Sequence, residues 1–573
     1  MKKRKKRFLV VLIPMILILI VAAVSIGIPL YQKYSYGTER ADLAEHYGVS
    51  GEMAAIILQN DQIPAQALIR DGRCYFDMDT VKAYLTEGFF YDGAYNGGCL
   101  MYTTAKETYE VCDGASSYGV SGVMTDLGYP LTLRENDKLY VAADYLKMFA
   151  LFTVDIYESH VQLYTMWGNT HEMRTVTRNT QIRERGGIKS PILRDVEDGE
   201  QVELIEAMED WSKVKTSDGI IGYIENKRMT SADPYTDIPP MAPTLPEYTT
   251  VRLDTKVNLG FHPVFGMAGN DTLGEALNEA LGINVIAPTW ISLTDNEGGF
   301  RNFGSADYVA RAHGNGIKVW VVADNFNYGN ENGIDIDETY LLSDTPRRRK
   351  LAADLVAAVT AVGADGLNFD FEQMPDDSSI YWVQFLREVS VLCRQNGICL
   401  STDNYVPYEY NSLYRLDLQG QFVDYVLIMG YDEHYPSGGV AGSVASIGYV
   451  QNGLNMTLEK VPSEKVINAL PFYTVLWTTS DGRTSGQYVT LNNQSDFLQR
   501  VGQTPVWDDE TGQNYAEWRE GTTLYQIWLE DSQSISAKLN VMNTMNLGGV
   551  GVWRIGYGNA DVWNLLRLYT YGQ

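Results

Sequence analysis

Residues 364–372 read Ala-Asp-Gly-Leu-Asn-Phe-Asp-Phe-Glu, an apolar strand that carries polar side chains at regular intervals. Alternate side chains of a strand face opposite ways. The leucine and the two phenylalanines therefore share one face, and Asn368, Asp370 and Glu372 line the other. Burying two carboxylates costs several kcal/mol unless they are hydrogen-bonded or protonated, so a strand that carries them indicates a use for the acids.

Glu372 ends this run, and two interpretations of it are open at this point. In the functional one, Glu372 is a carboxylic acid with a raised pKa, held by its neighbour Asp370, and it protonates a leaving group. In the other, the run is an ordinary strand end that meets a loop, and the two acids are simply solvated. A short motif alone does not decide between them, so the rest of the chain matters.

The N-terminus has the composition of a membrane anchor. Six of the first seven residues are Lys or Arg, and residues 8–30 form an uncharged run of 23 residues, which is long enough to span a bilayer. A secretory signal peptide has a shorter apolar core, although Ala22-Ala23-Val24-Ser25 keeps cleavage open. We expect residues 1–30 to be a cytoplasmic basic tail and an uncleaved transmembrane helix, with everything after Tyr31 outside the cell.

The charge balance and the cysteines exclude several classes of function. The formal net charge is −27, and without the six N-terminal cations the exported part carries about −33, which repels nucleic acid. Five cysteines are too few for a disulfide scaffold in a chain of this length. One bridge among Cys74, Cys99 and Cys112 is conceivable, and small buried thiols are the equal alternative. The sequence has no metal-ligand spacing, so we expect no metal and no cofactor.

Two small domains and a linker precede the largest part of the chain. Residues 39–167 alternate short β-prone runs with helical pieces and predict a small α+β domain. Its doubled pattern, CYFDMDTVKAYL and LYVAADYLKMF, resembles a family of extracellular domains named after the N-terminal part of copper amine oxidases, which implies a spacer or wall-binding role. Residues 174–230 place short β segments between turn dipeptides and resemble the bacterial SH3-type domain, a small all-β barrel whose members commonly contact peptidoglycan. Five prolines make residues 231–250 an extended linker.

The remainder, residues 251–573, alternates strand-like and helix-like segments, the pattern of a parallel α/β architecture. Eight such units in about 320 residues predict a (β/α)8 TIM barrel, in which catalytic groups sit where strands end in loops. The expected strands are Val257–Phe261, Val285–Ala287, Lys318–Val322, Gly366–Phe371, Cys399–Thr402, Tyr425–Met429, Val466–Leu470 and Gly551–Trp553.

Within this frame, the acid strand resembles the signature of glycoside hydrolase family 18. The spacing Asp-x-x-Asn-x-Asp-x-Glu begins at Asp365, and Met429-Gly430-Tyr431-Asp432 is similar to the family's Met-x-Tyr-Asp after the sixth strand. Trp553 matches the family's eighth-strand tryptophan, a flat apolar floor under the reacting sugar. Further similar segments are NLGFHPVF, APTWISL, VVADNF, LPFY and IWLEDSQSISAK. The resemblance implies catalytic roles for Glu372, Asp370, Tyr431 and Asp432, and substrate contacts for Trp553, Asn368, Asp365, Trp290, Asn325, Met429, Tyr473, Trp528 and Glu530.

The resemblance also implies a mechanism, because this family is an exception among retaining glycosidases and uses assistance from the substrate. The 2-acetamido oxygen of the sugar would attack its own anomeric carbon while Glu372 protonates the bridging oxygen. Asp370 would orient the acetamido nitrogen and stabilise the oxazolinium ion, and Tyr431 would donate a hydrogen bond near the acetamido oxygen. The family's usual Asp is Asn368 here, and we expect its amide to donate a hydrogen bond to Asp370 and hold it ionised.

Asparagine variants at this position occur in family members that act on bacterial wall and spore-cortex glycan. The leading hypothesis is therefore a single-pass membrane protein whose extracellular barrel cuts N-acetylglucosaminyl bonds in peptidoglycan. A chitinase or an endo-β-N-acetylglucosaminidase is the alternative within the same class. A non-catalytic glycan-binding wall protein is the alternative from another class, and the joint presence of Glu372, Asp370, Tyr431 and Trp553 argues against it.

Overall fold

The computed structural model of the chain describes residues 2–326 and 335–572. The protein divides into two compact units. The first comprises Met1–Gly88, Asp113–Ser117 and Asp126–Leu245. The second comprises Phe89–Cys112, Tyr118–Thr125 and Pro246–Gln573.

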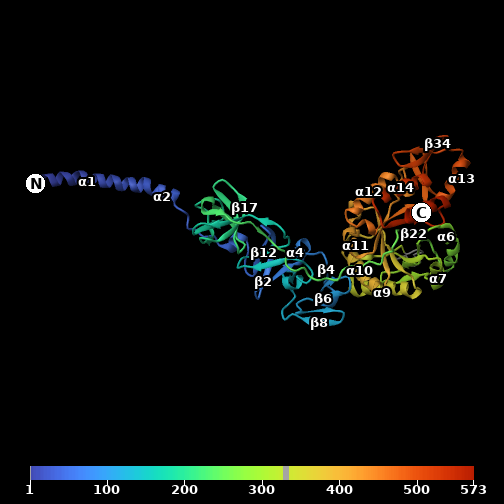
Figure 1. The fold of residues 1–573 in the computed structure, drawn as a ribbon, viewed down its shortest axis with the longest axis horizontal. Helices are drawn as coiled ribbons and strands as arrows, with labels where there is room; N and C mark the ends of the chain where they lie inside the picture. The colour runs from blue at the N-terminus through green and yellow to red at the C-terminus, as the bar shows by residue number, and fades with distance from the viewer. Residues whose placement is uncertain (1, 327–334, 573) are drawn as a thin grey trace. The chain divides into compact units, whose positions relative to one another are not determined.

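The first unit begins with a long apolar helix, drawn in blue in Figure 1. It runs through α1 (Lys2–Ala22), a π-helical turn (Ala23–Gly27) and α2 (Ile28–Tyr34). Residues Leu12–Tyr34 form a stretch of 23 residues with a mean hydropathy of 2.7, none of it buried against the rest of the protein. That length and composition suit a membrane span, and a signal sequence has the same properties.

A seven-stranded sheet follows in the first unit, with the strand order β11-β12-β1-β2-β3-β10-β9. Three short helices accompany it. The doubled sequence pattern corresponds to two matching pairs, since β3 leads into α4 and β10 leads into α5. The elements are α3 (Leu43–Tyr47), β1 (Met53–Leu58), β2 (Asp61–Arg70), β3 (Arg73–Asp77), α4 (Met78–Tyr84), β9 (Thr132–Glu135), β10 (Lys138–Ala142), α5 (Ala143–Leu146), β11 (Thr153–Ile156) and β12 (His160–Tyr164).

A second seven-stranded sheet, with the order β16-β15-β19-β18-β17-β14-β20, forms a small all-β domain. Its apolar core includes Val176, Ile182, Val214 and Ile224. All its strand pairs are antiparallel, as the turn-rich sequence predicts. The strands are β14 (Met173–Val176), β15 (Thr180–Arg183), β16 (Ile192–Val196), β17 (Gln201–Ala207), β18 (Trp211–Lys215), β19 (Ile221–Glu225) and β20 (Met229–Ser231), and β13 (Thr170–His171) pairs separately with β21 (Tyr235–Thr236).

The second unit contains a closed barrel of eight parallel strands. Neighbouring strands pair in sequence order around the ring, and β22 pairs with β36 to close it. The predicted TIM barrel is thereby confirmed. The strands are β22 (Val257–His262), β23 (Val285–Pro288), β26 (Lys318–Asp324), β27 (Gly366–Asp370), β28 (Cys399–Tyr405), β29 (Tyr425–Met429), β30 (Val466–Pro471) and β36 (Gly549–Trp553).

Helices surround this barrel, and the side chains of each strand alternate between the two sides. Leu367, Phe369 and Phe371 pack in the layer between strands and helices, which is the common face predicted for them. Asn368 and Asp370 lie on the other face, toward the barrel interior. The helices are α6 (Leu273–Glu279), α7 (Ala306–Gly314), α8 (Glu338–Ser343), α9 (Thr345–Val362), α10 (Ser379–Asn396), α11 (Leu416–Phe422), α12 (Ile447–Leu458), α14 (Ser532–Thr544) and α15 (Ala560–Tyr571).

Two insertions decorate the carboxyl ends of the strands. A short hairpin, β24 (Ile291–Leu293) and β25 (Phe300–Asn302), follows β23. A five-stranded antiparallel sheet with the order β32-β31-β35-β34-β33 stands between β30 and β36. The elements of this larger insertion are β31 (Tyr473–Ser480), β32 (Arg483–Thr490), α13 (Leu491–Val501), β33 (Val506–Asp508), β34 (Gln513–Glu520) and β35 (Thr523–Leu529).

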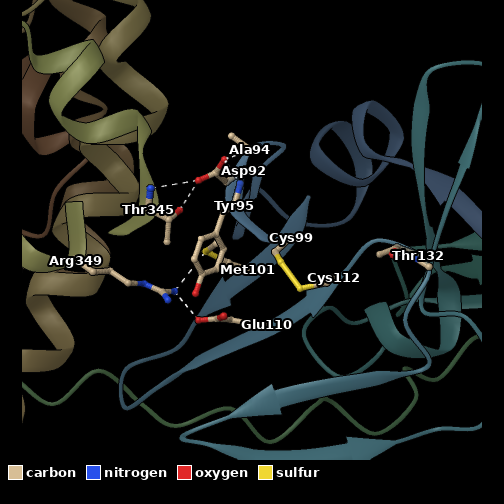
Figure 2. The surroundings of a disulfide bond; sticks show 11 residues. Asp92, Ala94, Tyr95, Cys99, Met101, Glu110, Cys112, Thr132, Thr345 and Arg349 are labelled. Atoms are coloured by element: carbon tan, nitrogen blue, oxygen red, sulfur yellow. Dashed lines mark hydrogen bonds and ion pairs between the residues drawn. A yellow bond between two sulfur atoms is a disulfide. The ribbon is translucent and has the colours of Figure 1, made fainter. Parts of the chain in front are cut away.

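A third sheet of the second unit docks on the barrel helices, although its strands lie far upstream in the sequence. The thiols of Cys99 and Cys112 form a disulfide between β5 and β6, and Figure 2 shows its surroundings. Asp92 accepts a hydrogen bond of 2.6 Å from Thr345, and Glu110 pairs with Arg349 at 2.6 Å. The strands of this sheet are β4 (Phe89–Asp92), β5 (Cys99–Thr103), β6 (Thr108–Cys112), β7 (Ser117–Val120) and β8 (Val123–Asp126).

Candidate active site

Acidic and aromatic side chains meet at the carboxyl ends of the barrel strands, the end where TIM barrels carry their active sites. They line a cavity of about 340 Å³. The lining residues are Phe261, Phe326, Asp370, Glu372, Asp403, Tyr405, Met429, Tyr431, Asp432, Tyr473, Tyr488, Trp553 and Tyr557. None of these is Lys, Arg or His, so protons are the only positive charges that the lining itself can supply.

Glu372 is half-buried directly after β27, and two neighbours fix it. The side-chain amide of Asn325 contacts the backbone of Glu372 twice, accepting from its N–H at 3.0 Å and donating to its carbonyl at 2.8 Å. The Tyr405 hydroxyl donates to Oε2 of Glu372 at 2.5 Å. Burial raises the pKa of Glu372 and the charge of Asp432 adds to this effect, although the Tyr405 hydrogen bond opposes it. A carboxylic acid in such a setting is suited to donating a proton.

Asp370 lies two residues before Glu372, at the end of β27, and faces the barrel interior. Burial raises its pKa well above the usual range, and the charges of Asp403 and Glu372 raise it further. Asp370 and Glu372 also form a side-chain hydrogen bond that favours the protonated form of Asp370 and the ionised form of Glu372. Two carboxyls this close titrate as a pair.

Asn368 does not contact Asp370, and the expected hydrogen bond between them is wrong. The Nδ2 atom of Asn368 donates instead to Ser401 Oγ and to Asp403 Oδ1, both at 2.9 Å. An amide nitrogen has two hydrogens, so neither remains for Asp370. The reason is the pairing of β27 with β28, which places Asn368 directly opposite Ser401.

Tyr431 and Asp432 follow β29 and also reach the cavity. Burial raises the pKa of Tyr431 well above its usual range, and the nearby carboxyls add to the shift, so this hydroxyl keeps its proton and remains a donor. Asp432 has a positive φ of 60°, uncommon for a residue other than glycine. Its carboxylate accepts a hydrogen bond of 2.6 Å from the Tyr473 hydroxyl.

Met429, Tyr473 and Trp553 line the cavity as well. Trp553 is half-buried, and its ring centroid lies 5.5 Å from that of Phe261. An indole held in this way offers a rigid apolar surface to a sugar ring. Of the residues predicted from the sequence, the cavity brings together these three with the four expected catalytic side chains.

Asp365 is far from this group, because it precedes β27 at the opposite end of the barrel. Its carboxylate accepts hydrogen bonds from the Val319 backbone at 2.9 Å and from Lys318 at 2.8 Å. These bonds outweigh burial and lower the pKa of Asp365. Asp365 thus ties together the amino ends of two strands and does not line the cavity.

Trp290, Trp528 and Glu530 are also absent from the lining. Trp290 is fully buried, and its indole N–H donates to Asn270 at 2.8 Å. Trp528 lies on β35 of the insertion with its ring centroid 4.7 Å from that of Tyr515. Glu530 is fully buried and pairs with Lys538 at 2.7 Å. Asn325 does not line the cavity either, but its side-chain amide hydrogen-bonds to the backbone of Glu372.

Several lining residues were missed by the sequence reasoning. Asp403 and Tyr405 lie on β28 and line the cavity. Asp324, at the end of β26, was missed as well; it lies outside the lining, buried, and accepts a hydrogen bond of 2.6 Å from Ser292. The signal was present, since each of these residues prolongs the alternating pattern of an apolar strand. The expected strands ended at Val322 and Thr402, two or three residues short of the structure, which left these side chains in the assumed loops.

No group of three or more His, Cys, Asp or Glu side chains in residues 2–326 and 335–572 is arranged to hold a metal ion. The arrangement supports general acid catalysis by one carboxyl, with a second carboxyl beside it to face a developing positive charge.

Comparison with known proteins identifies two sequence families. A sequence model described as glycosyl hydrolases family 18 matches residues 220–558. A second, described as bacterial SH3 domain, matches residues 178–230.

Curated relatives include the cortical fragment-lytic enzyme of Bacillus subtilis (strain 168), which is 28% identical over 250 residues, 39% of this chain and 54% of that protein. The uncharacterized glycosylase YvbX of the same organism is 24% identical over 273 residues, 44% of this chain and 75% of that protein. The chain thus spans about half the length of the cortical fragment-lytic enzyme that it matches.

Among solved structures, the Bacillus cereus spore cortex-lytic enzyme SleL is 21% identical with a TM-score of 0.49, covering 58% of this chain and 78% of that one. A chitinase from Chromobacterium violaceum ATCC 12472 is 20% identical with a TM-score of 0.49, covering 55% of this chain and 98% of that one.

Proposed function

Because the chain belongs to the glycosyl hydrolases of family 18, we propose that it hydrolyses β-linked N-acetylglucosaminyl bonds in peptidoglycan at the outer side of the cell membrane. The observation that carries this proposal is the pair Asp370 and Glu372, which share a hydrogen bond at the wall of a cavity with an aromatic lining. The pair supplies an acid and an adjacent anion, and Trp553 supplies a surface for the sugar.

The same pair supports assistance by the substrate. Most retaining glycosidases place two carboxyls about 5–5.5 Å apart across the sugar, one as acid and the other as nucleophile. Asp370 ends β27 and Glu372 follows two residues later. Their side chains hydrogen-bond to each other, so they cannot flank opposite faces of a ring. A 2-acetamido group on the substrate can act as the nucleophile in place of the second carboxyl.

The reaction then proceeds in two steps. Glu372 gives its proton to the bridging oxygen while the acetamido oxygen forms a bond to the anomeric carbon, and the leaving sugar departs as an alcohol. Asp370, as the anion, accepts from the acetamido N–H and faces the positive oxazolinium ring, and the Tyr431 hydroxyl donates to the acetamido oxygen. Glu372, now ionised, takes a proton from water, whose oxygen attacks the anomeric carbon. The bond from that carbon to the acetamido oxygen breaks, which restores the acetamido group, and the configuration is retained.

Peptidoglycan is favoured as the substrate by three observations. Curated relatives include proteins named cortical fragment-lytic enzyme from Bacillus species. The family's common Asp is Asn368 in this chain, and a bacterial SH3 domain precedes the barrel. A chitinase-like activity is the alternative, since another relative is named probable di-N-acetylchitobiase 1 of Dictyostelium discoideum, 24% identical with 62% of that protein covered.

We place the barrel outside the cell on an uncleaved anchor. The apolar helix Leu12–Tyr34 follows a run of Lys and Arg, a charge distribution that keeps the N-terminus in the cytoplasm. Sequencing the N-terminus of the protein from membranes should find the basic tail intact. A mature N-terminus near Ser25 on protein recovered from the medium would contradict the anchor.

Digestion of two polymers tests the substrate. The full chain in detergent is incubated with purified peptidoglycan and, separately, with chitin oligomers, and the products are analysed by mass. We expect fragments with new N-acetylglucosamine reducing ends from peptidoglycan. Cleavage of chitin alone supports the chitinase alternative, and binding without cleavage of either polymer supports a non-catalytic wall protein.

A further inference from the structure

Asp403 is a buried carboxyl in the cavity wall that the mechanism above does not use. It lies on β28, beside the strand that carries Asp370 and Glu372. One of its oxygens, Oδ1, accepts the hydrogen bond of 2.9 Å from Asn368. This hydrogen bond from Asn368 on β27 therefore holds Asp403 in place. Position 368 is also where a second aspartate of β27 would lie if the residue were Asp.

The hydrogen bonds around Asn368 leave the inner end of the site without a donor. Both hydrogens of Asn368 Nδ2 are used by Ser401 and Asp403. Within the described part of the chain, Asn368 Oδ1 and Asp370 Oδ1 are buried without a hydrogen-bond partner. These two oxygens are acceptors, so a proton on a neighbouring carboxyl is the group that this part of the cavity lacks.

We propose that Asp403 is a positioning residue for the glycosidase reaction: it stays protonated, so that Asp370 and Glu372 share one proton and one negative charge, and it serves from β28 in place of a second aspartate on β27. This inference rests on the proposed function. The arrangement carries one negative charge among three carboxyls. This charge passes to Asp370, where it faces the oxazolinium ion, when Glu372 takes up the proton of the pair for the reaction.

The surrounding groups disfavour a second negative charge in this cluster of carboxyls. Asp370, Glu372 and Tyr431 line the same cavity as Asp403, and Tyr405 follows it on β28. Asp324 on β26 and Asp432 after β29 add negative charge around Glu372. With acids on three sides and no cationic side chain among the described residues of the lining, full ionisation of the cluster is unfavourable.

The pKa of Asp403 agrees with this assignment. Burial raises it to about 8, and the charge of Glu372 raises it while the hydrogen bond from Asn368 opposes the shift. Asp403 is then neutral through the acid and neutral pH range. Above that range its negative charge draws the remaining proton onto Asp370, which removes the anion that the reaction needs.

Asp403→Asn tests the proposal, because asparagine keeps the shape and the acceptor for Asn368 but does not ionise. The kcat/KM of the full chain in detergent on purified peptidoglycan is measured against pH for both proteins. We expect the acid limb to stay in place and the alkaline limb to move up by about one pH unit, the scale of coupling between neighbouring carboxyls. Superimposable profiles, or a folded variant that is inactive at every pH, would overturn the proposal.

A second pair of variants keeps the test decisive. Asn368→Asp alone places a fourth carboxyl in the cluster, and we expect it to move both limbs. Adding Asp403→Asn to Asn368→Asp restores three carboxyls with an amide between them, and we expect the double variant to return toward the native profile. A double variant that is no closer to the native profile than Asn368→Asp alone would contradict the proposal that Asp403 serves in place of an aspartate at position 368.

Two further measurements separate this inference from the proposed function. Labelling the aspartate carboxyls with 13C lets their titration be followed without substrate, and a resonance with a midpoint near 8 should be missing from Asp403→Asn. Glu372→Gln serves as the control for the reaction itself. Activity retained by Glu372→Gln defeats the proposed function, whereas unchanged titration in Asp403→Asn defeats only the role of Asp403.

Discussion

Removing Lys538 tests whether Glu530 is a structural residue, as its surroundings indicate, or a substrate contact, as the sequence suggested. Both side chains of the pair are fully buried, and Lys538 Nζ contacts the two carboxylate oxygens at 2.7 and 2.9 Å. Gln513 and Ser534 donate to the same carboxylate at 2.7 and 2.9 Å. The carboxylate is therefore satisfied within the protein and has no direction left for a ligand.

Lys538→Met should lower the free energy of unfolding by about 3–5 kcal/mol, the usual loss when one partner of a buried ion pair is removed. The loss should depend on pH. Burial raises the pKa of Glu530 while Lys538 lowers it, so the variant leaves the pKa of the folded state above that of the unfolded state. Such a carboxyl is tolerated at acid pH, and stability is lost as the pH rises through the folded pKa.

The assay is the urea midpoint for loss of glycosidase activity, which reports on the barrel alone. Lys350→Met is the matched control, because Lys350 and Asp354 form an exposed pair at 2.6 Å, and such surface pairs contribute little to stability. Adding Glu530→Gln to Lys538→Met should recover most of the loss. A fall in kcat/KM of the folded Lys538→Met protein without a change in the midpoint would refute the structural role of the pair.

Three other changes have directions that the structure determines. Replacing both Cys99 and Cys112 by Ser should lower stability by about 3 kcal/mol, the entropy of closing so short a loop, and calorimetry under non-reducing conditions checks it. Tyr405→Phe removes the hydrogen bond that favours ionised Glu372, so the alkaline limb of kcat/KM should move to higher pH. Asn325→Ala frees the backbone of Glu372, and kcat should fall about tenfold or more, at about 1.4 kcal/mol for each factor of ten, with KM little changed. An alkaline limb that does not move in Tyr405→Phe, or a kcat that does not fall in Asn325→Ala, would contradict the proposal that these two residues position Glu372.

Much of the barrel could be predicted because its strands are continuous apolar runs, which is what burial on both faces requires. The catalytic group could be predicted for a related reason. Glu372, Asp432 and Trp553 each end or follow a strand, and the carboxyl ends of parallel strands meet at one end of a barrel. Asp365 comes before its strand, so it lies at the other end of the barrel.

What the sequence did not show depends on contacts between strands. The hydrogen bonds of Asn368 follow from the register of β27 against β28, and no local pattern contains that register. The bridge between Cys99 and Cys112 likewise follows from the hairpin that sets these two residues opposite each other. Trp290 and Glu530 were assigned by residue type and neighbourhood, and only tertiary packing shows that their polar atoms are satisfied inside the protein.

The acid role of Glu372 is tested most directly by Glu372→Gln, measured on purified peptidoglycan beside Glu409→Gln, a change at an exposed position. Glutamine keeps the shape of the side chain but cannot protonate the bridging oxygen. We predict that Glu372→Gln releases no new N-acetylglucosamine reducing ends while it still binds the polymer, and that Glu409→Gln matches the native protein. Product release by Glu372→Gln within a few-fold of the native rate would contradict the account.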